Sequence, residues 1–333
     1  MPDPLLEVRN LRVEFPTRRQ TLVALDDVSF DIGQGEILGV VGESGAGKSL
    51  TGAAVIGLLE PPGRIAAGSI RLMGERIDDL PYQRLRQLRG RRIGAIFQDP
   101  LTSLNPLFSV GDQLRETILA HTDLSASQAE QRALSLLREV GIPAAEQRMH
   151  HFPHQFSGGM RQRVVIALAL CANPRLIIAD EPTTALDVSV QAQVIALLKR
   201  LSREYETAIM LITHDLGVIA EAARRVAVMY AGRIVEIGPV ADVIERPRHP
   251  YTAGLMGAIP VLGRARRRLT QIDGAMPRLN AIPSGCAFGP RCRQRFDRCE
   301  RERPELKPLG ARRVACWLGE AGPDRPDSEP QHV

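Results

Sequence analysis

The segment Gly42–Ser49, with the sequence GESGAGKS, constrains the fold more than any other part of the chain. It fits the pattern G-x-x-x-x-G-K-[ST], in which glycines let backbone N–H groups converge on phosphate oxygens. It follows the apolar run Ile37–Val41, which predicts a buried strand, and it precedes a segment from Leu50 to Leu59 that is compatible with a helix. A strand, a glycine-rich loop and a helix in this order predict an α/β fold with a phosphate site at the helix N-terminus.

The side chains of this loop have the chemistry that a nucleotide phosphate requires. Lys48 can reach the β- and γ-phosphates, and the Ser49 hydroxyl can ligate Mg²⁺. A glycine-rich turn that binds nothing is the alternative, which the strand–loop–helix context disfavours. The residues predicted to contact ATP in this segment are Gly42, Glu43, Ser44, Gly45, Ala46, Gly47, Lys48, Ser49 and Leu50.

A second element of the phosphate site is predicted at Leu176–Glu181, where an apolar strand ends in two acids. Carboxylates at the carboxyl edge of a parallel sheet lie where open α/β sheets bind their ligands. Asp180 is expected to hold Mg²⁺, directly or through water, and Glu181 to polarise the water that attacks the γ-phosphate. In the alternative the two acids only end a strand, but the phosphate loop upstream disfavours it.

The segment Phe156–Arg163, with the sequence FSGGMRQR, runs into a stretch that is compatible with a helix. It resembles the signature motif of ATP-binding cassette (ABC) ATPases, which is usually written L-S-G-G-Q. Met160 departs from that pattern, whereas Ser157, Gly158 and Gly159 retain the residues that contact phosphate. A serine and two glycines at a helix N-terminus form an anion site. The resemblance implies that this site closes over the nucleotide held by the opposite subunit of a dimer.

Further positions match the same family in order along the chain. The resemblance implies that Gln98 senses the metal and the γ-phosphate, that Asp187 communicates across the dimer, and that His214 contacts the γ-phosphate. Phe15 stands at the usual place of the aromatic residue that stacks on adenine, and a role in the core remains open for it. Together these matches imply catalytic roles for Lys48, Gln98, Glu181 and His214, Mg²⁺ ligation by Ser49, Gln98 and Asp180, and further ATP contacts by Phe15, Gln98, Ser157, Gly158, Gly159, Asp187 and His214.

The periodicity of the chain predicts how these motifs are arranged. Leu5–Phe15 and Leu25–Ile32 alternate apolar and polar residues, as half-buried antiparallel strands do. The strands that carry the phosphate loop, Glu181 and His214 alternate with helices, which predicts a largely parallel sheet. We therefore expect an α/β fold, in which an ABC-type phosphate-loop core carries an antiparallel β subdomain, a helical subdomain and a small, loop-rich, cysteine-containing C-terminal extension.

Changes in pattern along the chain predict the domain boundaries. Residues 99–165 read as amphipathic helices without strands between them, which resembles the helical subdomain of ABC ATPases. We place the whole nucleotide-binding domain at residues 1–238. Prolines interrupt helical periodicity repeatedly beyond this point, so residues 239–320 are expected to form the loop-rich extension. Residues 321–333 are polar and rich in proline, and we expect disorder there.

Four of the five cysteines lie in this extension, namely Cys286, Cys292, Cys299 and Cys316. Disulfides are rare in cytosolic proteins, so four cysteines in one small region suggest a metal site. Structural zinc usually brings closer C-x2-4-C pairs, whereas a four-thiolate iron–sulfur cluster tolerates wider spacing. The residues alone leave a cluster, zinc and unligated thiols open. The fifth cysteine, Cys171, lies in an apolar helix and is expected in the core.

The extension carries a resemblance of its own. Pro247–Thr252 and the tail with the four cysteines resemble the C-terminal extension of peptide importer ATPases of the dipeptide, oligopeptide and nickel branch. This resemblance implies a [4Fe–4S] cluster on those four cysteines, with Zn²⁺ as the alternative, besides ATP and Mg²⁺. The motifs and the tail together look most like the first ATPase subunit of bacterial dipeptide permeases.

Composition argues against several other classes of function. Aromatic residues make up 4% of the chain, too few for a platform that stacks single-stranded nucleic acid, and the net charge of +5 is modest. Residues 1–10 lack the apolar run of a signal peptide, and the longest apolar run, Val164–Ala172, is too short to cross a bilayer. We therefore expect a cytoplasmic protein that meets a membrane only through a partner.

The resemblance implies an ATP-hydrolysing subunit of an importer for dipeptides and oligopeptides, at the cytoplasmic face of the bacterial inner membrane. The implied partners are a second homologous ATPase subunit, two membrane permease subunits and an extracytoplasmic peptide-binding protein, with no nucleic acid. Import of nickel, glutathione or haem on the same architecture is the alternative within transport. A soluble ABC ATPase acting on DNA or the ribosome would usually carry two cassettes or a long coiled coil, and this sequence has one cassette and no heptad run.

Overall fold

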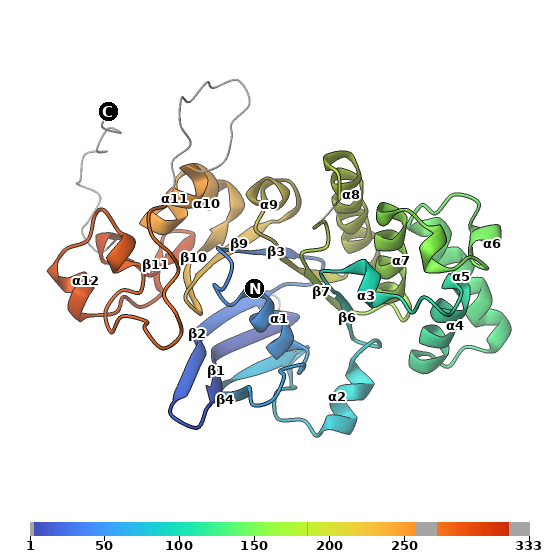
Figure 1. Cartoon of the computed structure of the whole chain (residues 1–333), viewed down its shortest axis with the longest axis horizontal. Helices are drawn as coiled ribbons and strands as arrows, with labels where there is room; N and C mark the ends of the chain where they lie inside the picture. Colours follow the sequence, from blue (N-terminus) through green and yellow to red (C-terminus); the bar gives the residue numbers. More distant parts are fainter. Residues whose placement is uncertain (1–2, 185, 258–271, 320–333) are drawn as a thin grey trace.

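A computed structural model describes residues 3–184, 186–257 and 272–319, and an eight-stranded sheet runs through its centre (Figure 1). The order of the strands is β11-β12-β10-β9-β3-β8-β7-β6, and the pairs from β9 to β6 are parallel. The strands are β3 (Ile37–Val41), β6 (Ile93–Ile96), β7 (Leu176–Asp180), β8 (Ala208–Ile212), β9 (Arg225–Tyr230), β10 (Arg233–Pro239), β11 (Lys307–Leu309) and β12 (Arg312–Val314).

Strands of this sheet are buried on both faces, as parallel strands flanked by other layers are. In β7, Leu176 and Ile178 belong to one apolar core, and Ile177 and Ala179 belong to a second core on the opposite face. This alternation follows from the two-residue repeat of a strand. The carboxyl end of β7 therefore delivers its two acids to the rim of the sheet rather than to either core.

A second sheet, antiparallel, packs beside the first and has the strand order β2-β1-β4-β5. Its strands are β1 (Leu6–Pro16), β2 (Thr21–Ile32), β4 (Arg64–Leu72) and β5 (Glu75–Arg76). In β1, every second residue from Leu6 to Val8 and from Leu11 to Val13 is fully buried, which is the alternation that the sequence predicts. The two sheets share one apolar core, because side chains of β1, β2, β3 and β8 all contribute to it.

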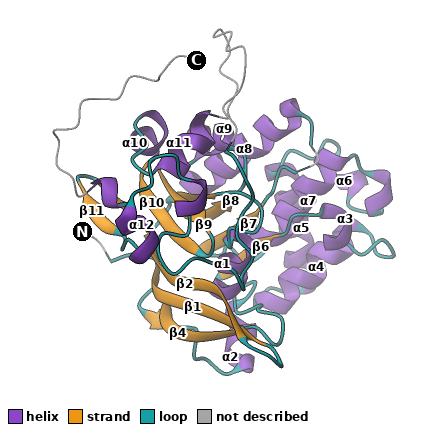
Figure 2. Ribbon diagram, turned by 60° about the vertical axis from the view of Figure 1, so that its left-hand side comes forward, coloured by secondary structure: helices purple, strands orange, loops and turns teal. Residues whose placement is uncertain are grey.

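Helices cover the central sheet and extend from it on one side (Figure 2). They are α1 (Lys48–Val55), α2 (Tyr82–Leu88), α3 (Pro100–Ser103), α4 (Val110–His121), α5 (Ala126–Glu139), α6 (Ala145–Arg148), α7 (Gly158–Leu170), α8 (Val188–Tyr205), α9 (Leu216–Ala222), α10 (Val240–Glu245), α11 (Pro250–Gly257) and α12 (Asp297–Arg301), with single 3-10 turns at η1 (Pro153–Gln155), η2 (Gly289–Arg291) and η3 (Trp317–Gly319). Helix α1 is shorter than the predicted segment, because Gly57 adopts a φ of 68° and ends it.

The group of helices from α3 to α7 stands to one side of the sheet in both ribbon views (Figures 1 and 2). A capping box starts α5: the Ser125 hydroxyl accepts from the backbone N–H of Gln128, and the Gln128 side chain accepts from the backbone N–H of Ser125. Buried Leu114, Ile118 and Leu136 from α4 and α5 join the core that lies on this side of the sheet.

The C-terminal extension contributes strands to the central sheet. Strand β12 pairs with β10, so two short strands of the extension continue the sheet at its edge. Arg312 of β12 donates to the fully buried carboxylate of Glu236 at 3.2 Å, and that carboxylate also accepts from the backbone N–H groups of Arg248 and His249. The disorder that we predict for residues 321–333 falls outside the described residues. Among the residues that are described, no helix has the length and apolar character needed to span a membrane.

Candidate nucleotide-binding site

The phosphate loop joins β3 to α1, in the order of strand, loop and helix that the sequence predicts. Gly42 has a φ of 154°, and a Cβ atom at this position would lie 2.3 Å from the carbonyl oxygen of Met229. Only glycine fits there, because the loop packs directly on the backbone of β9. The amide of Ala46 donates to the carbonyl of Glu43, and the carbonyl of Ala46 accepts from the amide of Gly232, so the loop is tied on both sides.

Lys48 lies at the centre of the loop and is almost fully buried. Its Nζ donates to the carbonyl oxygens of Gly42 at 2.9 Å and of Glu43 at 3.1 Å. Burial lowers the pKa of Lys48, while the carboxylates of Glu181 and Asp180 act to raise it. A buried ammonium group with partners of this kind is well placed to exchange a carbonyl for a phosphate oxygen.

Ser49 and Asp180 come together at the carboxyl end of β7. The Ser49 hydroxyl donates to the Asp180 carboxylate at 3.0 Å. Burial raises the pKa of Asp180, since it disfavours the charged form. A hydroxyl and a carboxylate side by side are the hard oxygen donors that Mg²⁺ prefers. This pair therefore fits the metal that ABC ATPases are expected to use.

Glu181 lies at the centre of the site, and three side chains contact its carboxylate. Gln98 Nε2 donates to its Oε2 at 3.2 Å, and Nδ1 of His214 lies 3.3 Å from its Oε1. The hydroxyl of Thr184 also donates to Oε2, at 2.7 Å. Burial acts to raise the pKa of Glu181, but the hydrogen bonds from Thr184 and His214 outweigh burial and lower it. The carboxylate is therefore ionised at neutral pH, as a proton acceptor must be.

The structure thus brings together residues that the sequence places far apart, and it adds one. Gln98 follows β6, Glu181 follows β7 and His214 follows β8, so three neighbouring parallel strands end at the same rim. Thr184 has a role that sequence reasoning missed. It stands three residues after Glu181, on the turn that leads to α8, and that spacing is the signal by which its contact with the carboxylate could be anticipated.

The signature residues begin α7. The Ser157 hydroxyl accepts from the backbone N–H of Met160 at 3.3 Å and caps the helix. A Cβ atom on Gly159 would lie 2.5 Å from a methyl group of Val190 on α8, so the two helices approach closely here. Asp187 caps α8 by accepting from the backbone N–H of Val190. The signature and the Asp187 turn are consequently one packed unit.

Two further positions that the sequence singles out, Phe15 and Cys171, lie away from the group of side chains around Glu181. Phe15, at the end of β1, is partly buried, and a Cβ atom on Gly63 would lie 2.7 Å from its ring. The ring packs against the core of the antiparallel sheet. Cys171 is buried at the end of α7, and burial raises its pKa to about 12.

The four cysteines of the extension line one small pocket of about 20 Å³, together with His249, Phe288 and Trp317. Burial raises the pKa values of Cys286 and Cys292, and that of Cys316 to about 12. Among the described residues, no group of three or more His, Cys, Asp or Glu side chains is placed to hold a metal ion. The thiols converge on a common space, but the geometry gives no ligand set for iron or zinc.

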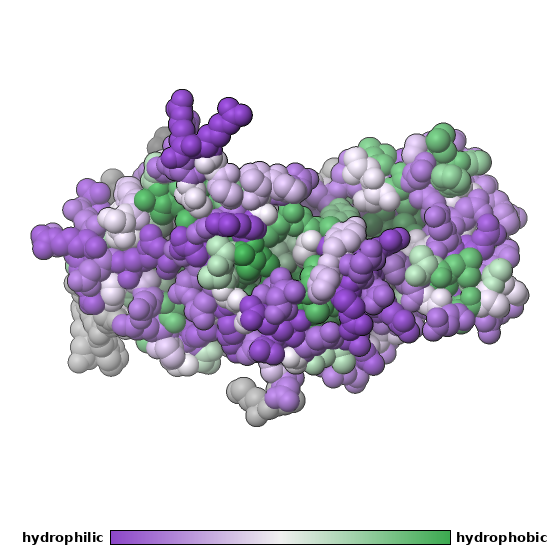
Figure 3. Space-filling view, turned by 90° about the horizontal axis from the view of Figure 1, so that it is seen from below, coloured by the Kyte–Doolittle hydropathy of each residue, from purple (hydrophilic) through white to green (hydrophobic). Residues whose placement is uncertain are grey.

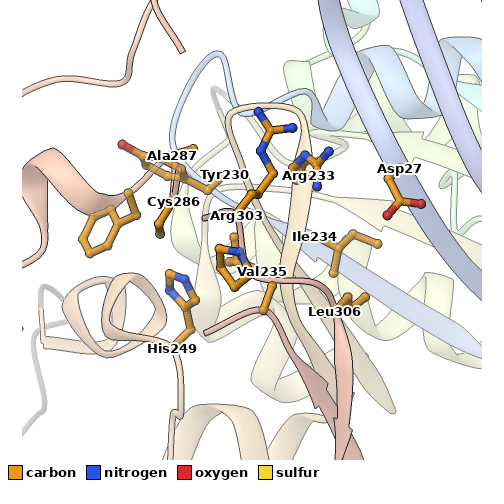
Figure 4. A pocket seen from close by; sticks show the side chains of 13 residues that line it. Asp27, Tyr230, Arg233, Ile234, Val235, His249, Cys286, Ala287, Arg303 and Leu306 are labelled. Carbon is orange, nitrogen blue, oxygen red and sulfur yellow. The ribbon is translucent and has the colours of Figure 1, made fainter. Parts of the chain in front are cut away.

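An adjoining pocket of about 30 Å³ lies between the extension and strands β2 and β10. Figure 4 shows His249 and Cys286 on one side of it and Asp27 on the other, with Arg233 and Arg303 between them. Both arginines pair with the carboxylate of Asp26, which also pairs with Arg12, so this one negative charge only partly offsets theirs.

A groove of about 520 Å³ lies between α1, α3 and α7, beside the segment that carries Gln98. Its lining is mostly apolar and includes Leu58, Phe97 and Leu168, of which Phe97 is half exposed. Exposed Leu101 and Leu107 follow on the adjacent turn. The face of the molecule seen from below is mostly hydrophilic and carries separate apolar patches (Figure 3).

The fold and the rim of the sheet point to the ABC class of ATP hydrolases, and comparison with known proteins agrees. Residues 25–184 match the family model for ABC transporters, and residues 235–299 match that for the C-terminal region of oligopeptide and dipeptide transporters. The dimeric structure of MJ0796, a bacterial ABC transporter cassette, aligns with 71% of this chain and 98% of its own at a TM-score of 0.63 and 28% identity. CbiO1 of Clostridium perfringens aligns with 73% of this chain and 92% of its own at a TM-score of 0.63. The predicted fold class is confirmed.

Curated relatives cover nearly the whole chain. The oligopeptide transport ATP-binding protein AppD of Bacillus subtilis is 46% identical over 95% of this chain and 97% of its own. The dipeptide transport ATP-binding protein DppD of B. subtilis is 47% identical over 95% of both chains. OppD of Salmonella typhimurium, an oligopeptide transport ATP-binding protein, is 49% identical over 90% of this chain and 89% of its own. The chain therefore belongs to the ATP-binding proteins of oligopeptide and dipeptide ABC transporters, and it is an ATP hydrolase.

Proposed function

We propose that this chain hydrolyses ATP to power the uptake of dipeptides and oligopeptides through permease subunits of the bacterial inner membrane. The observation that carries this proposal is its match to peptide-transport relatives, which extends beyond the cassette into the region of residues 235–299. Members of this family work with membrane permease subunits. We infer that this chain acts at the cytoplasmic face of the membrane, held there by those subunits, with an extracytoplasmic protein that delivers the peptide.

In the proposed reaction each side chain of the rim has one task. Lys48 exchanges its loop carbonyls for phosphate oxygens, and Ser49 with Asp180 would hold Mg²⁺, which neutralises phosphate charge when bound. Glu181 accepts the proton of the attacking water. Gln98 and His214, both in contact with Glu181, orient that water and report the presence of the γ-phosphate. Such a site accelerates phosphoryl transfer because it positions the water and the phosphate and stabilises the charge of the transition state.

We propose that the signature residues complete the site of a second, homologous ATPase subunit. In both ribbon views α7 stands with the helical group, away from α1 (Figures 1 and 2). The backbone N–H groups of Ser157, Gly158 and Gly159 stand at the N-terminus of α7, where they have no partner within the helix, which suits them to a phosphate from another chain. Asp187, packed against this turn, would couple the two sites. The related cassette MJ0796 was solved as a dimer.

We propose that a membrane permease subunit docks in the groove beside Gln98. Its apolar lining suits the apolar face of a short helix from a membrane subunit. Phe97, Thr102 and Ser103 of one segment line the groove, and Gln98 of the same segment donates to Glu181. A movement of the docked helix would thus reach the hydrolytic carboxylate through a few residues of one segment.

We retain the predicted division into a nucleotide-binding domain at residues 1–238, with its helical subdomain at 99–165, and an extension at 239–320. A [4Fe–4S] cluster on the four cysteines of the extension is part of this proposal, because they line one pocket, but they are not placed as a ligand set in this structure and would have to move to bind it. Thiolates are the ligands that such clusters require. Anaerobic purification followed by iron and acid-labile sulfide analysis tests it. Zinc without iron would replace the cluster by the alternative metal, and neither metal would leave four unligated thiols.

Uptake measurements test the proposed function directly. In the organism that carries this gene, uptake of labelled dipeptide, tetrapeptide and nickel would be compared between wild type and Glu181→Gln. Glu130→Gln, an exposed substitution on α5, is the matched control. We expect the first variant to lose peptide uptake and to keep nickel uptake, while the control keeps both. Loss of nickel uptake alone would move the chain to the alternative substrate, and unchanged uptake of all three would refute an importer.

A further inference from the structure

The C-terminal extension contacts the phosphate loop at Glu43. Arg291 of the extension donates to its carboxylate through two parallel bonds, Nη1 to Oε2 at 2.6 Å and Nη2 to Oε1 at 2.9 Å. The hydroxyl of Tyr251 accepts from the backbone N–H of Glu43 at 2.8 Å. The carbonyl of Glu43 in turn accepts from Nζ of Lys48. All three polar groups of this residue are therefore engaged, two of them by the extension.

Arg291 itself is held in place. Its side chain is only 7% exposed, and Nε donates to the carbonyl oxygen of Asp273 at 2.8 Å. Nη2 also lies 3.3 Å from the carbonyl oxygen of Gly274, and the guanidinium stands 5.8 Å from the centre of the Tyr230 ring. A planar guanidinium fixed in this way fits a carboxylate in one orientation only. The contact thus has the rigidity that positioning requires.

Tyr251 is fixed as firmly as Arg291. It is fully buried, and its ring packs edge-on against Tyr230 with the ring centres 4.6 Å apart. Tyr230 lies at the end of β9, the strand whose Met229 carbonyl touches Gly42. The extension and the central sheet consequently hold the loop from two directions.

This arrangement differs from the exposed ion pairs of the extension. The pair of Arg293 with Asp273 joins two side chains that are 79% and 73% exposed, and such pairs contribute little. The Glu43 pair is bidentate and largely shielded from water, and it lies on the loop rather than on the surface. If Glu43 moves, the carbonyl bound to Lys48 moves with it.

We infer that Arg291 is a positioning residue for nucleotide binding, which holds the phosphate loop in its binding geometry through Glu43, with Tyr251 as its second support. This inference rests on the proposed nucleotide site at Lys48. It makes the extension part of the ATP site and gives this part of the chain a function within the cassette. A loop that is ordered before the nucleotide arrives binds it more tightly, because less ordering remains to be done on binding.

Equilibrium binding of Mg–ADP to the purified full-length chain, measured by calorimetry, tests this inference. We expect Arg291→Gln to raise the Kd about tenfold, which corresponds to ~1.4 kcal/mol. Arg293→Gln, two residues away and exposed, is the matched control and should bind as wild type does. Tyr251→Phe removes only one hydroxyl and should raise the Kd in the same direction. The double variant Glu43→Gln with Arg291→Gln should bind no more weakly than either single variant, because the two side chains act as one unit.

The outcomes separate this inference from the site on which it rests. Lys48→Ala should abolish binding, and if that variant still binds Mg–ADP normally, the proposed nucleotide site is wrong. If Lys48→Ala fails to bind while Arg291→Gln and Tyr251→Phe bind as wild type does, the positioning role alone is refuted. A lower melting temperature of Arg291→Gln with an unchanged Kd would show that the pair only attaches the extension, and it would also refute the inference.

Discussion

Replacing Thr184 by valine isolates one hydrogen bond of the proposed catalytic carboxylate. The Thr184 hydroxyl donates to Oε2 of Glu181 at 2.7 Å, and this bond is one of the causes that lower the pKa of Glu181. A hydrogen bond to a charged group contributes about 1.5–3 kcal/mol. Because the Glu181 side chain is 16% exposed, water can replace part of it, so the low end applies. Losing this bond removes roughly 1.5 kcal/mol of stabilisation of the ionised form, so we expect the pKa of Glu181 to rise.

The sign of the effect on catalysis follows from the role proposed for Glu181. Only its ionised form accepts a proton, so a higher pKa leaves less active enzyme at acidic pH. The acid limb of the pH profile of kcat should therefore move toward neutrality, while kcat on the alkaline plateau changes little. Steady-state phosphate release across the pH range measures this.

Thr184→Ser keeps the donor and is the control for this experiment, because the serine hydroxyl can make the same bond. Its acid limb should coincide with that of wild type. An acid limb in Thr184→Val that coincides with wild type would refute the reasoning. An equal shift in the serine variant would show that packing at this turn, rather than the hydrogen bond, controls the pKa of Glu181.

Three further predictions follow from close contacts elsewhere in the chain. Gly159→Ala should lower ATP turnover about tenfold or more with Mg–ADP binding unchanged, because the new methyl group meets Val190, and an added Val190→Ala should restore turnover. Glu236→Leu should destabilise the fold by about 3–5 kcal/mol in urea denaturation, because it leaves the buried Arg312 with only a 4.0 Å contact to a carboxylate, that of Asp242, and Arg312→Leu added to it should recover part of that loss. Cys171 should resist alkylation in the native protein and react after unfolding, since it is buried with a pKa of about 12.

The local parts of the structure were predictable because they depend on short patterns. The phosphate loop has a fixed spacing, and the alternation of β1 has a period of two, so both are visible in a few residues. The end of α1 was not predicted, because the apolar residues continue past Gly57 and the positive φ at that glycine decides the boundary. The meeting of Gln98 with Glu181 could be expected once both were placed at the ends of neighbouring parallel strands.

The contacts between the extension and the cassette could not be predicted from the sequence, because they join residues that are far apart along the chain. Arg291 and Glu43 are separated by 248 positions, and no period or spacing connects them. The same holds for Tyr251, 208 positions from Glu43. Prolines in the extension predicted loops, yet β12 pairs with β10 and prolongs the central sheet. Whether β12 pairs with β10 depends on the unpaired N–H and C=O groups at the edge of the sheet, and the local sequence of the extension does not encode them.

The attachment of the extension changes how variants of its cysteines must be interpreted. Arg291 lies in the single turn η2, which joins Cys286 to Cys292, and the carbonyls of Cys286 and Gly289 accept from the amides of Gly289 and Cys292. A substitution that disturbs the thiol pocket will therefore also displace the guanidinium that holds Glu43. Loss of ATP turnover in a cysteine variant does not by itself indicate a role for a bound metal. Turnover must be read beside the Kd for Mg–ADP, because only a variant with normal nucleotide binding and altered turnover separates the pocket from the phosphate loop.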